Sequence, residues 1–439
     1  MMQTEIAGRI PAVYAGRRAR LAQLMQRGVA VVPTAPEQAR NRDSHYPYRY
    51  DSYFYYLTGF PEPEAVLVLV AGDPGRSILF CRDKDAEREV WDGFRYGLER
   101  ARAEFHFDES HSISELDTLL PKLLADQPAL HCHLGSDGRW DERVLQALNA
   151  VRAQARTGVT APAAIYDVRA LLDEMRLLKD AHELAIMRRA AQISTAAHRR
   201  AMGAVKPGRA EYEIEAELLH EFRRRGAQAP AYTSIVAGGA NACVLHYVSN
   251  DAVLNAGELL LVDAGCELDG YAADITRTYP VSGRFTPAQR DVYQMVLAAQ
   301  GAAIAAVQPG AAWTAPHDAA LRVLAQGLID FGLCQGSVDK VIEAGDYKRF
   351  YMHRTGHWLG LDVHDAGDYK RDGQWRELKP GMVLTVEPGC YIRGDDVPPQ
   401  FANTGIRIED DVLVTASGNE VLTHAAPKSV QDIEALMRG

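Results

Sequence analysis

Cysteine is scarce in this sequence, and no two cysteines have the spacing of a metal-binding or redox pair. The 439 residues include six cysteines and no Cys-x-x-Cys motif. Small disulfide-held domains and zinc-ribbon modules carry denser and more regular cysteine patterns. The scarcity therefore favours reduced thiols in a cytoplasmic protein, and it argues against a disulfide or zinc framework.

Long hydrophobic runs and an excess of positive charge are also missing. No stretch approaches the roughly 20 apolar residues that a membrane span needs, and the first 20 residues lack the apolar core of a signal peptide. The net charge of −10 argues against a nucleic-acid partner, since phosphate binding requires a basic surface. The composition, 47% apolar and 24% charged, is that of a soluble globular protein with two or three domains.

The first 165 residues alternate short strands with helical stretches. Residues 66–70 and 78–81 are predicted as adjacent strands around a Gly-Asp-Pro-Gly turn. Residues 116–125 and 142–152 are predicted as helices. This mixture predicts an α/β N-terminal domain over residues 1–165, followed by a linker at Ala161-Pro162-Ala163, and it contains no glycine-rich phosphate loop.

The remainder, residues 166–439, contains a short internal repeat. The pentapeptides AVKPG (204–208) and AVQPG (306–310) each follow an alanine-rich predicted helix. Each also precedes a second predicted helix, which Gly226 closes in one copy and Gly332 in the other. The duplicated order predicts a second domain with pseudo-two-fold internal symmetry.

The leading helix of each copy carries a recognisable start. Asp180 with Glu183 three residues later forms a variant of the capping box. Thr286 supplies a cap, Pro287 the first helical residue and Gln289 the capping-box partner. We therefore expect helices to begin directly after Asp180 and Thr286.

Five residues of the second domain have the composition of a two-metal hydrolase site. Four carboxylates carry four formal negative charges, which two divalent cations would neutralise, whereas burial without metal would force protonation. An oxygen-dominated site with one imidazole suits manganese, cobalt or zinc, and hard carboxylates favour manganese. Two such ions would activate a water molecule for hydrolysis. The five residues are Asp263, Asp274, His357, Glu387 and Glu409.

Strand geometry supports this grouping. A hairpin around Asp269-Gly270 places Asp263 and Asp274 on one face, unless a bulge at Gly265 changes the register. In the fourth motif Arg407 and Glu409 share a face by strand alternation. The alternative, that acids cap strand ends and face water, fits Asp410 and Asp411, the two residues after Glu409.

The motifs around these residues resemble one family. VDAGCELDGYAADITRTYP, HRTGHWLGLDVHD, TVEPGCYI and GIRIEDD are similar to the aminopeptidase P group of the pita-bread metallopeptidases, over most of the last two-thirds of the chain. The resemblance implies a pita-bread α+β catalytic domain with metals between its halves. It also implies a manganese-dependent aminopeptidase that removes the first residue of peptides with proline in second position. Prolidase, which cleaves Xaa-Pro dipeptides, and a non-catalytic pita-bread binding module are the alternatives.

The resemblance also implies a role for each ligand. Asp263 and Asp274 would hold the first metal, and His357 and Glu387 the second. Asp274 and Glu409 would contact both. Glu387 would in addition accept the proton of the attacking water.

The histidines need sorting because the chain has 14. His353 and His364 match positions that in the family contact substrate carbonyls and the oxyanion. His246, with Tyr391 and Arg407, would orient that network and relay a proton to the leaving nitrogen. The remaining histidines considered are read as structural or surface groups, with three of them on solvated helix faces: His106, His111, His131 and His133, then His182, His198 and His220.

Trp91 lies in a short polar segment, EREVWDGFRYG. A tryptophan there is either half-buried core or, as in related enzymes, a side chain that reaches toward the active site of a neighbouring subunit. The second interpretation predicts a homo-oligomer, a dimer or a tetramer.

Overall fold

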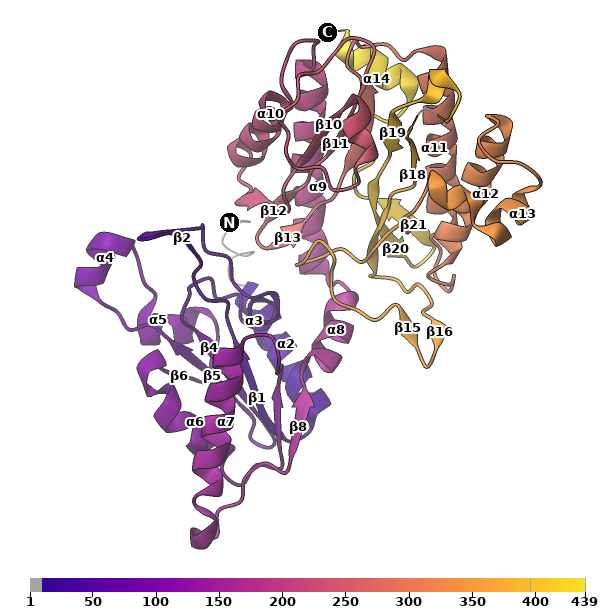
Figure 1. The fold of residues 1–439 in the computed structure, drawn as a ribbon. Helices are drawn as coiled ribbons and strands as arrows, with labels where there is room; N and C mark the ends of the chain where they lie inside the picture. The colour runs from indigo at the N-terminus through magenta and orange to yellow at the C-terminus, as the bar shows by residue number, and fades with distance from the viewer. Residues whose placement is uncertain (1–9, 395, 439) are drawn as a thin grey trace. The chain divides into compact units, whose positions relative to one another are not determined.

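The computed structural model describes residues 10–394 and 396–438, and these form two compact units (Figure 1). The first unit ends at Met175, and the second begins at Arg176. In the part of the chain that the structure describes, no helix is both long and apolar enough to cross a membrane.

The first unit is built on a six-stranded mixed sheet with strand order β6-β5-β4-β1-β7-β8. β4 runs antiparallel to both neighbours, and the other pairs are parallel. Valine and leucine fill the central strands, which are buried on both faces. The strands are β1 (Gly28–Pro33), β4 (Val66–Ala71), β5 (Arg76–Cys81), β6 (Glu109–Ser112), β7 (Ala129–Cys132) and β8 (Ala164–Asp167).

Helices and one small hairpin complete this unit. The predicted hairpin is confirmed, since β4 and β5 pair antiparallel, and both predicted helices are present. The second of these begins four residues early because Asp137 caps it. The elements are α2 (Ile10–Met25), β2 (Ala39–Asn41), β3 (Ser44–His45), α3 (Ser52–Thr58), α4 (Ala86–Asp92), α5 (Gly97–Glu104), α6 (Leu116–Leu124), α7 (Gly138–Arg152) and α8 (Arg169–Leu177), which crosses the unit boundary.

Trp91 is exposed on α4, not half-buried. Its side chain is 81% exposed, and the adjacent Val90 is 82% exposed. No residue of α4 is buried, so the interpretation of Trp91 as core is wrong.

The second unit repeats the predicted order of two helices followed by strands. Its first half has α9 (Ala181–Ala204) and α10 (Glu211–Arg224) beside the sheet β10-β11-β14. Its second half has α11 (Pro287–Ala306) beside the strands of the sheets β17-β20-β21 and β18-β19, and α12 (Ala315–Asp330) packs against α11 (Figure 1). The strands are β10 (Ile235–Gly238), β11 (Leu259–Asp263), β14 (Thr276–Pro280), β17 (Val383–Val386), β18 (Gly389–Ile392), β19 (Thr404–Arg407), β20 (Asp410–Thr415) and β21 (Gly418–Val421).

Both predicted helix starts are confirmed. Asp180 caps α9 through the backbone N–H groups of His182 and Glu183, and the Glu183 carboxylate returns to Asp180 N. Thr286 caps α11 in the same way with Gln289. These caps fix where the helices enter the two halves.

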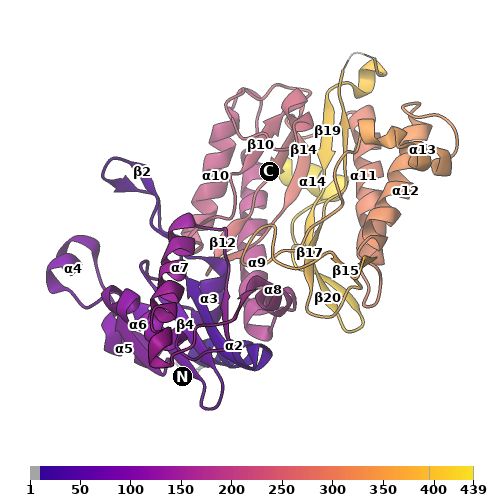
Figure 2. The same ribbon diagram turned by 60° about the horizontal axis from the view of Figure 1, so that its bottom comes forward.

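Smaller elements surround the two halves. In Figure 2 the short helix α13 lies beside α12, away from the strands. These elements are β9 (Ala229–Pro230), β12 (Cys266–Leu268), β13 (Tyr271–Ala272), α13 (Val338–Ala344), β15 (Lys370–Arg371), β16 (Gln374–Trp375) and α14 (Val430–Met437).

The hairpin that carries the first two acids keeps one register throughout. Asp263 pairs with Thr276 on one side of Gly265, and Glu267 pairs with Ala272 on the other. Gly265 is required by close approach, since a Cβ there would lie 1.6 Å from the carbonyl oxygen of Ala273. The hairpin therefore places Asp263 and Asp274 on one face, diagonally, as predicted.

Candidate metal centre and active site

One cavity of about 600 Å³ in the second unit gathers most of the predicted site. Its lining includes all five predicted metal ligands and four of the other predicted site residues. The first group is Asp263, Asp274, His357, Glu387 and Glu409, and the second is His246, His353, His364 and Arg407. Tyr391 lies next to them, because its hydroxyl contacts both His353 and Arg407.

The acids of the first half share a tyrosine that sequence reasoning missed. The hydroxyl of Tyr232 donates to Asp263 Oδ1 at 2.5 Å and also contacts Asp274. A phenol has one proton, so it can satisfy only one of two ionised carboxylates. This contact favours either protonation of one acid or a cation shared by both. Tyr232 follows β9, and no spacing in its AYTS segment marks it as functional.

Threonines of β14 connect the first half to the last motif. Thr276 Oγ1 donates to Glu409 Oε2 at 2.6 Å, and Arg407 Nε donates to Thr276 Oγ1 at 3.1 Å. Arg407 also donates from Nη2 to Asp263 Oδ2 at 2.5 Å. Arg407 and Glu409 thus reach the same site, as their strand alternation predicts.

His357 and Glu387 come from adjacent backbone segments. The imidazole Nε2 of His357 lies 3.5 Å from Asp274 Oδ2 and 3.7 Å from Glu387 Oε1. Its Nδ1 lies 2.9 Å from the carbonyl oxygen of Trp358, which orients Nε2 toward the acids. Gly356 permits this approach, because a Cβ there would lie 2.0 Å from the carbonyl oxygen of Thr385. The predicted ligands of both halves therefore meet.

The pKa values reflect the crowding of negative charge. Burial raises the pKa of Glu387 to about 7. Burial and the charge of Asp274 raise the pKa of Glu409 well above its ordinary value, and burial raises that of Asp274. Burial lowers the pKa of His357, but the hydrogen bond to Asp274 and the charge of Glu387 prevail and raise it to about 9. A bound cation would favour the ionised form of these carboxylates and so oppose the upward shifts.

The donor set fits divalent metal ions. Ligand atoms of Asp274, His357 and Glu409 all lie within 4.8 Å of one another. Carboxylate oxygens with one imidazole nitrogen are the donors that manganese and zinc accept. Two divalent cations would balance the formal negative charge of the four carboxylates.

Of the remaining predicted site residues, Tyr391 lies next to the cavity and the others line it. His353 Nε2 lies 2.9 Å from the Tyr391 hydroxyl, which accepts from Arg407 Nη1 at 3.0 Å. Burial, with the positive charge of Arg407, lowers the pKa of His353 to about 4. Burial, with the charge of His357, lowers the pKa of His364, whose ring centroid lies 4.3 Å from that of His357. Both shifts favour the neutral imidazole, and His353 donates from Nδ1 to the carbonyl oxygen of Arg354 at 2.7 Å.

Two acids and one histidine differ from expectation. Asp410 and Asp411 are 0% and 1% exposed, so the prediction that they face water is wrong. Asp411 instead accepts the backbone N–H of Asp274, and Asp410 pairs with buried Arg277. His198 does not lie on a solvated face either. It is buried, with Nε2 2.9 Å from the carbonyl oxygen of Ala264, directly after Asp263.

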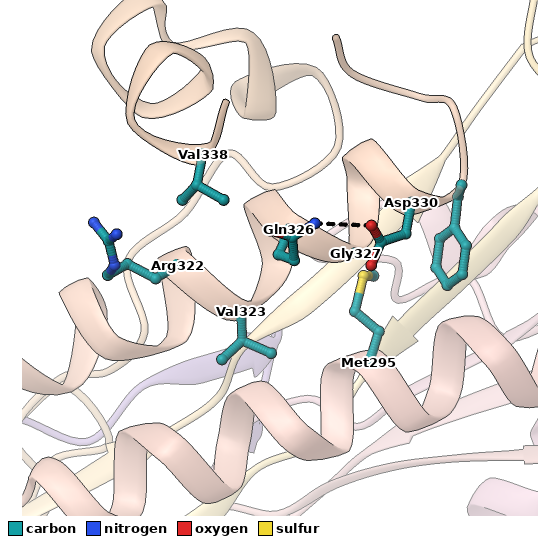
Figure 3. Close-up of a pocket in the computed structure, with 8 residues that line it drawn as sticks. Met295, Arg322, Val323, Gln326, Gly327, Asp330 and Val338 are labelled. Carbon is teal, nitrogen blue, oxygen red and sulfur yellow. Dashed lines mark hydrogen bonds between the residues drawn. The ribbon is translucent and has the colours of Figure 1, made fainter. Parts of the chain in front are cut away.

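A second cavity in this unit, of about 530 Å³, has a different character (Figure 3). It lies between α11, α12 and α13 and is lined mainly by apolar groups such as Met295 and Val323. Gln326 Nε2 donates to Asp330 Oδ1 at 2.8 Å within it (Figure 3), and Arg322 donates to Asp339. Its polar side chains are therefore occupied with one another, and the convergent acids lie in the first cavity.

Comparison with known proteins agrees with the family that the sequence motifs resemble. Residues 185–416 match the metallopeptidase family M24, and residues 14–131 match the aminopeptidase P N-terminal domain. The chain is 47% identical to an Xaa-Pro aminopeptidase of Haemophilus influenzae, over 96% of each chain. It is similar to a solved Pseudomonas aeruginosa aminopeptidase (TM-score 0.96, 48% identity, 98% of each chain). It is also similar to a zinc-substituted Escherichia coli aminopeptidase P in complex with product (TM-score 0.95, 44% identity, 98% of each chain). The chain belongs to the metallopeptidase family M24 and is a metal-dependent exopeptidase with a pita-bread catalytic domain.

Proposed function

We propose that this enzyme is an aminopeptidase that hydrolyses the bond between an N-terminal residue and a following proline. The observation that carries the proposal is the convergence of four acids, three of them buried, and four imidazoles in one cavity. The Xaa-Pro preference is supported by the names of relatives that match over nearly their whole length.

The metal ligands in this proposal are the five residues at the floor of the cavity. Asp263 and Asp274 would hold one divalent ion, His357 and Glu387 the other, and Asp274 and Glu409 both. When bound, such ions lower the pKa of water and polarise the scissile carbonyl. Manganese is the proposed ion because hard oxygen donors dominate the set.

Glu387 takes the proton of the attacking water. Its carboxylate lies near two imidazoles, with Oε2 3.8 Å from His353 Nδ1 and Oε1 3.7 Å from His357 Nε2. A carboxylate that lines the cavity beside these imidazoles is placed to act as a general base.

His353 and His364 hydrogen-bond substrate carbonyls and the tetrahedral oxyanion. Arg407 and Tyr391 hold His353 in place through a chain of hydrogen bonds. His246 lines the same cavity and, with Tyr391, helps relay a proton to the leaving nitrogen. That nitrogen belongs to a proline ring, so it leaves as a secondary amine and requires a proton.

Trp91 belongs to the proposal as a contact between subunits of a homo-oligomer. Its exposure and that of Val90 support an unsatisfied apolar surface. Trp91→Ala should then change kcat/KM among peptides of different length, while Val90→Ala should change it less. An unaltered kcat/KM at every length for Trp91→Ala would remove this role.

Two further expectations accompany the proposal. A cytoplasmic location is supported by six unpaired, buried cysteines. The functional limits of the domains are proposed as residues 1–165 for the N-terminal domain and 166–439 for the catalytic domain.

The test is hydrolysis of three matched substrates by the manganese-loaded enzyme: an Xaa-Pro dipeptide, an Xaa-Pro-Xaa tripeptide and a longer peptide. Higher kcat/KM for the two longer substrates supports the proposal. Activity confined to the dipeptide would indicate a prolidase. No hydrolysis of any of the three by folded, metal-loaded protein would indicate a binding module.

A further inference from the structure

Directly behind the residues of the last motif that face the cavity lies a buried ion pair between Arg277 and Asp410. Arg277 is completely buried on β14, one residue after Thr276, and its side chain points away from the cavity because strand residues alternate. Asp410 follows Glu409 and is also completely buried. Their carboxylate–guanidinium contact is 2.7 Å between Asp410 Oδ1 and Arg277 Nη2.

Arg277 uses its donors on backbone next to the predicted ligands. Nη1 donates to the carbonyl oxygens of Thr276 at 2.9 Å and of Glu409 at 2.5 Å. Nη2 donates to the carbonyl oxygen of Ala426 and Nε to that of Pro427, each at 3.1 Å. One guanidinium therefore joins the strand after Asp274, the backbone of Glu409 and the C-terminal segment.

Asp410 extends this network to β17, the strand that precedes Glu387. Its Oδ2 accepts from Lys428 Nζ at 2.6 Å and from Gln300 Nε2 at 3.0 Å. Gln300 Nε2 is also shared with the carbonyl oxygens of Ile408 at 3.2 Å and Val386 at 3.4 Å. Val386 directly precedes Glu387, and Ile408 directly precedes Glu409.

The network thus contacts backbone beside three predicted ligands that come from different halves of the fold. Asp274 lies in the first half, and Glu387 and Glu409 in the second. Two strands from separate halves could slide or separate by a few tenths of an ångström without losing apolar contact, whereas a fully bonded guanidinium resists such a shift. A metal site requires its ligands to be held at such accuracy.

We propose that Arg277, Asp410 and Gln300 are positioning residues that set the separation of Asp274, Glu387 and Glu409 and so determine the metal affinity of the site. The inference rests on the proposed function, because it concerns the metal site that this function requires. The three residues touch neither the cavity nor a substrate.

The test measures Mn²⁺ binding to the chelator-treated full chain by isothermal titration calorimetry, without any substrate. Arg277→Lys keeps the charge but replaces five N–H donors in a planar fork by the three of one ammonium group. Gln300→Leu removes the carbonyl contacts without changing a charge. Both should bind Mn²⁺ about 10- to 100-fold more weakly than the wild type, the usual effect of losing groups that orient metal ligands. Gln300→Leu also reports if Arg277→Lys fails to fold.

A matched control separates positioning from general stability. Val341 is buried on α13, so Val341→Ala should lower the melting temperature of the same unit and leave Mn²⁺ affinity unchanged. Variants that melt earlier but keep wild-type affinity would overturn the inference alone. A wild-type chain that took up no Mn²⁺ would overturn the proposed function, and the inference with it.

Discussion

Glu409 and Asp410 are neighbours in sequence, equally buried, and opposite in electrostatic character. Burial and the charge of Asp274 raise the pKa of Glu409 well above its ordinary value. Burial also acts to raise the pKa of Asp410, but Arg277 and Lys428 outweigh it and hold that pKa below its ordinary value. The difference lies in the partners, because the depth of burial is the same.

The acids that face the cavity outnumber the cationic side chains beside them, whereas Asp410 has enough cationic partners. Four acids face the cavity with Arg407 and His357 as their cationic neighbours. Asp410 alone has two cations within 2.7 Å. The comparison teaches that the partners of a buried acid decide in which direction its pKa moves.

The largest effect should follow from removing an acid on the cavity side. Asp274→Asn and Glu409→Gln should each lower metal affinity and rate by more than about 10³-fold, exceeding any histidine change outside His357, because each acid is expected to contact both ions. Metal content and kcat measured on the same preparations provide the check.

Asp269→Asn is the matched control. It makes the same substitution in the turn of the same hairpin, at φ 48°, where asparagine is readily accepted. An Asp274→Asn enzyme that retained two metal ions and near-normal turnover would break the comparison on the cavity side.

Loss of a neutral imidazole should have a smaller and different effect. His353→Ala and His364→Ala should lower kcat by about 10²–10³-fold while two metal ions remain bound, since a lost oxyanion donor removes transition-state contacts only. His220→Ala, at an exposed position of α10, provides the control. A variant that lost a metal ion would show a ligand, and one that melted early with near-normal kcat would show a structural histidine.

The metal-free protein sharpens the comparison further. Asp410→Asn leaves Arg277 and Lys428 without their carboxylate and should lower the free energy of unfolding by about 3–5 kcal/mol. Glu409→Gln replaces a carboxyl whose pKa is raised well above its ordinary value, and it should leave that free energy unchanged or raise it. Urea unfolding in the presence of a chelator measures both, and equal losses would contradict the distinction.

The smallest expected effect concerns a second buried acid, Asp365, which has two cationic partners. Arg176 and Lys179 lie 2.6 and 2.8 Å from the two oxygens of Asp365, next to His364. Burial acts to raise the pKa of Asp365, but Lys179 and Arg176 hold it below its ordinary value. The stability that this provides is present above the unfolded pKa of about 3.9 and is lost as pH falls through the folded pKa, at about 1.4 kcal/mol per pKa unit.

Asp365→Asn should therefore lower the melting temperature at pH 7 and reduce its further fall below pH 4. Asp167→Asn, which alters an ion pair with half-exposed Arg169, should change the melting temperature little. Melting curves from pH 3 to 7 compare the variants. An Asp365→Asn profile parallel to that of the wild type would show that this carboxyl does not titrate with unfolding.

Local patterns in the sequence determined much of the fold. The caps at Asp180 and Thr286, the duplicated helix pairs and the hairpin at Asp269-Gly270 depend on contacts within a few residues, so the sequence specifies them directly. The hairpin register likewise brings Asp263 and Asp274 to one face. These features were predictable because the interacting groups are close in the chain.

Only the tertiary structure decided which side chains behind and beside those motifs matter. Tyr232 reaches Asp263 and Asp274 from 31 and 42 residues away, and Arg277 reaches Asp410 from 133. Asp410 follows a predicted ligand and resembles a solvated strand end in sequence, yet it is buried because α11 and the C-terminal segment cover it with Gln300 and Lys428. Whether a polar residue faces water or a counterion depends on elements distant in the chain, and no local sequence pattern shows which of these elements packs against it.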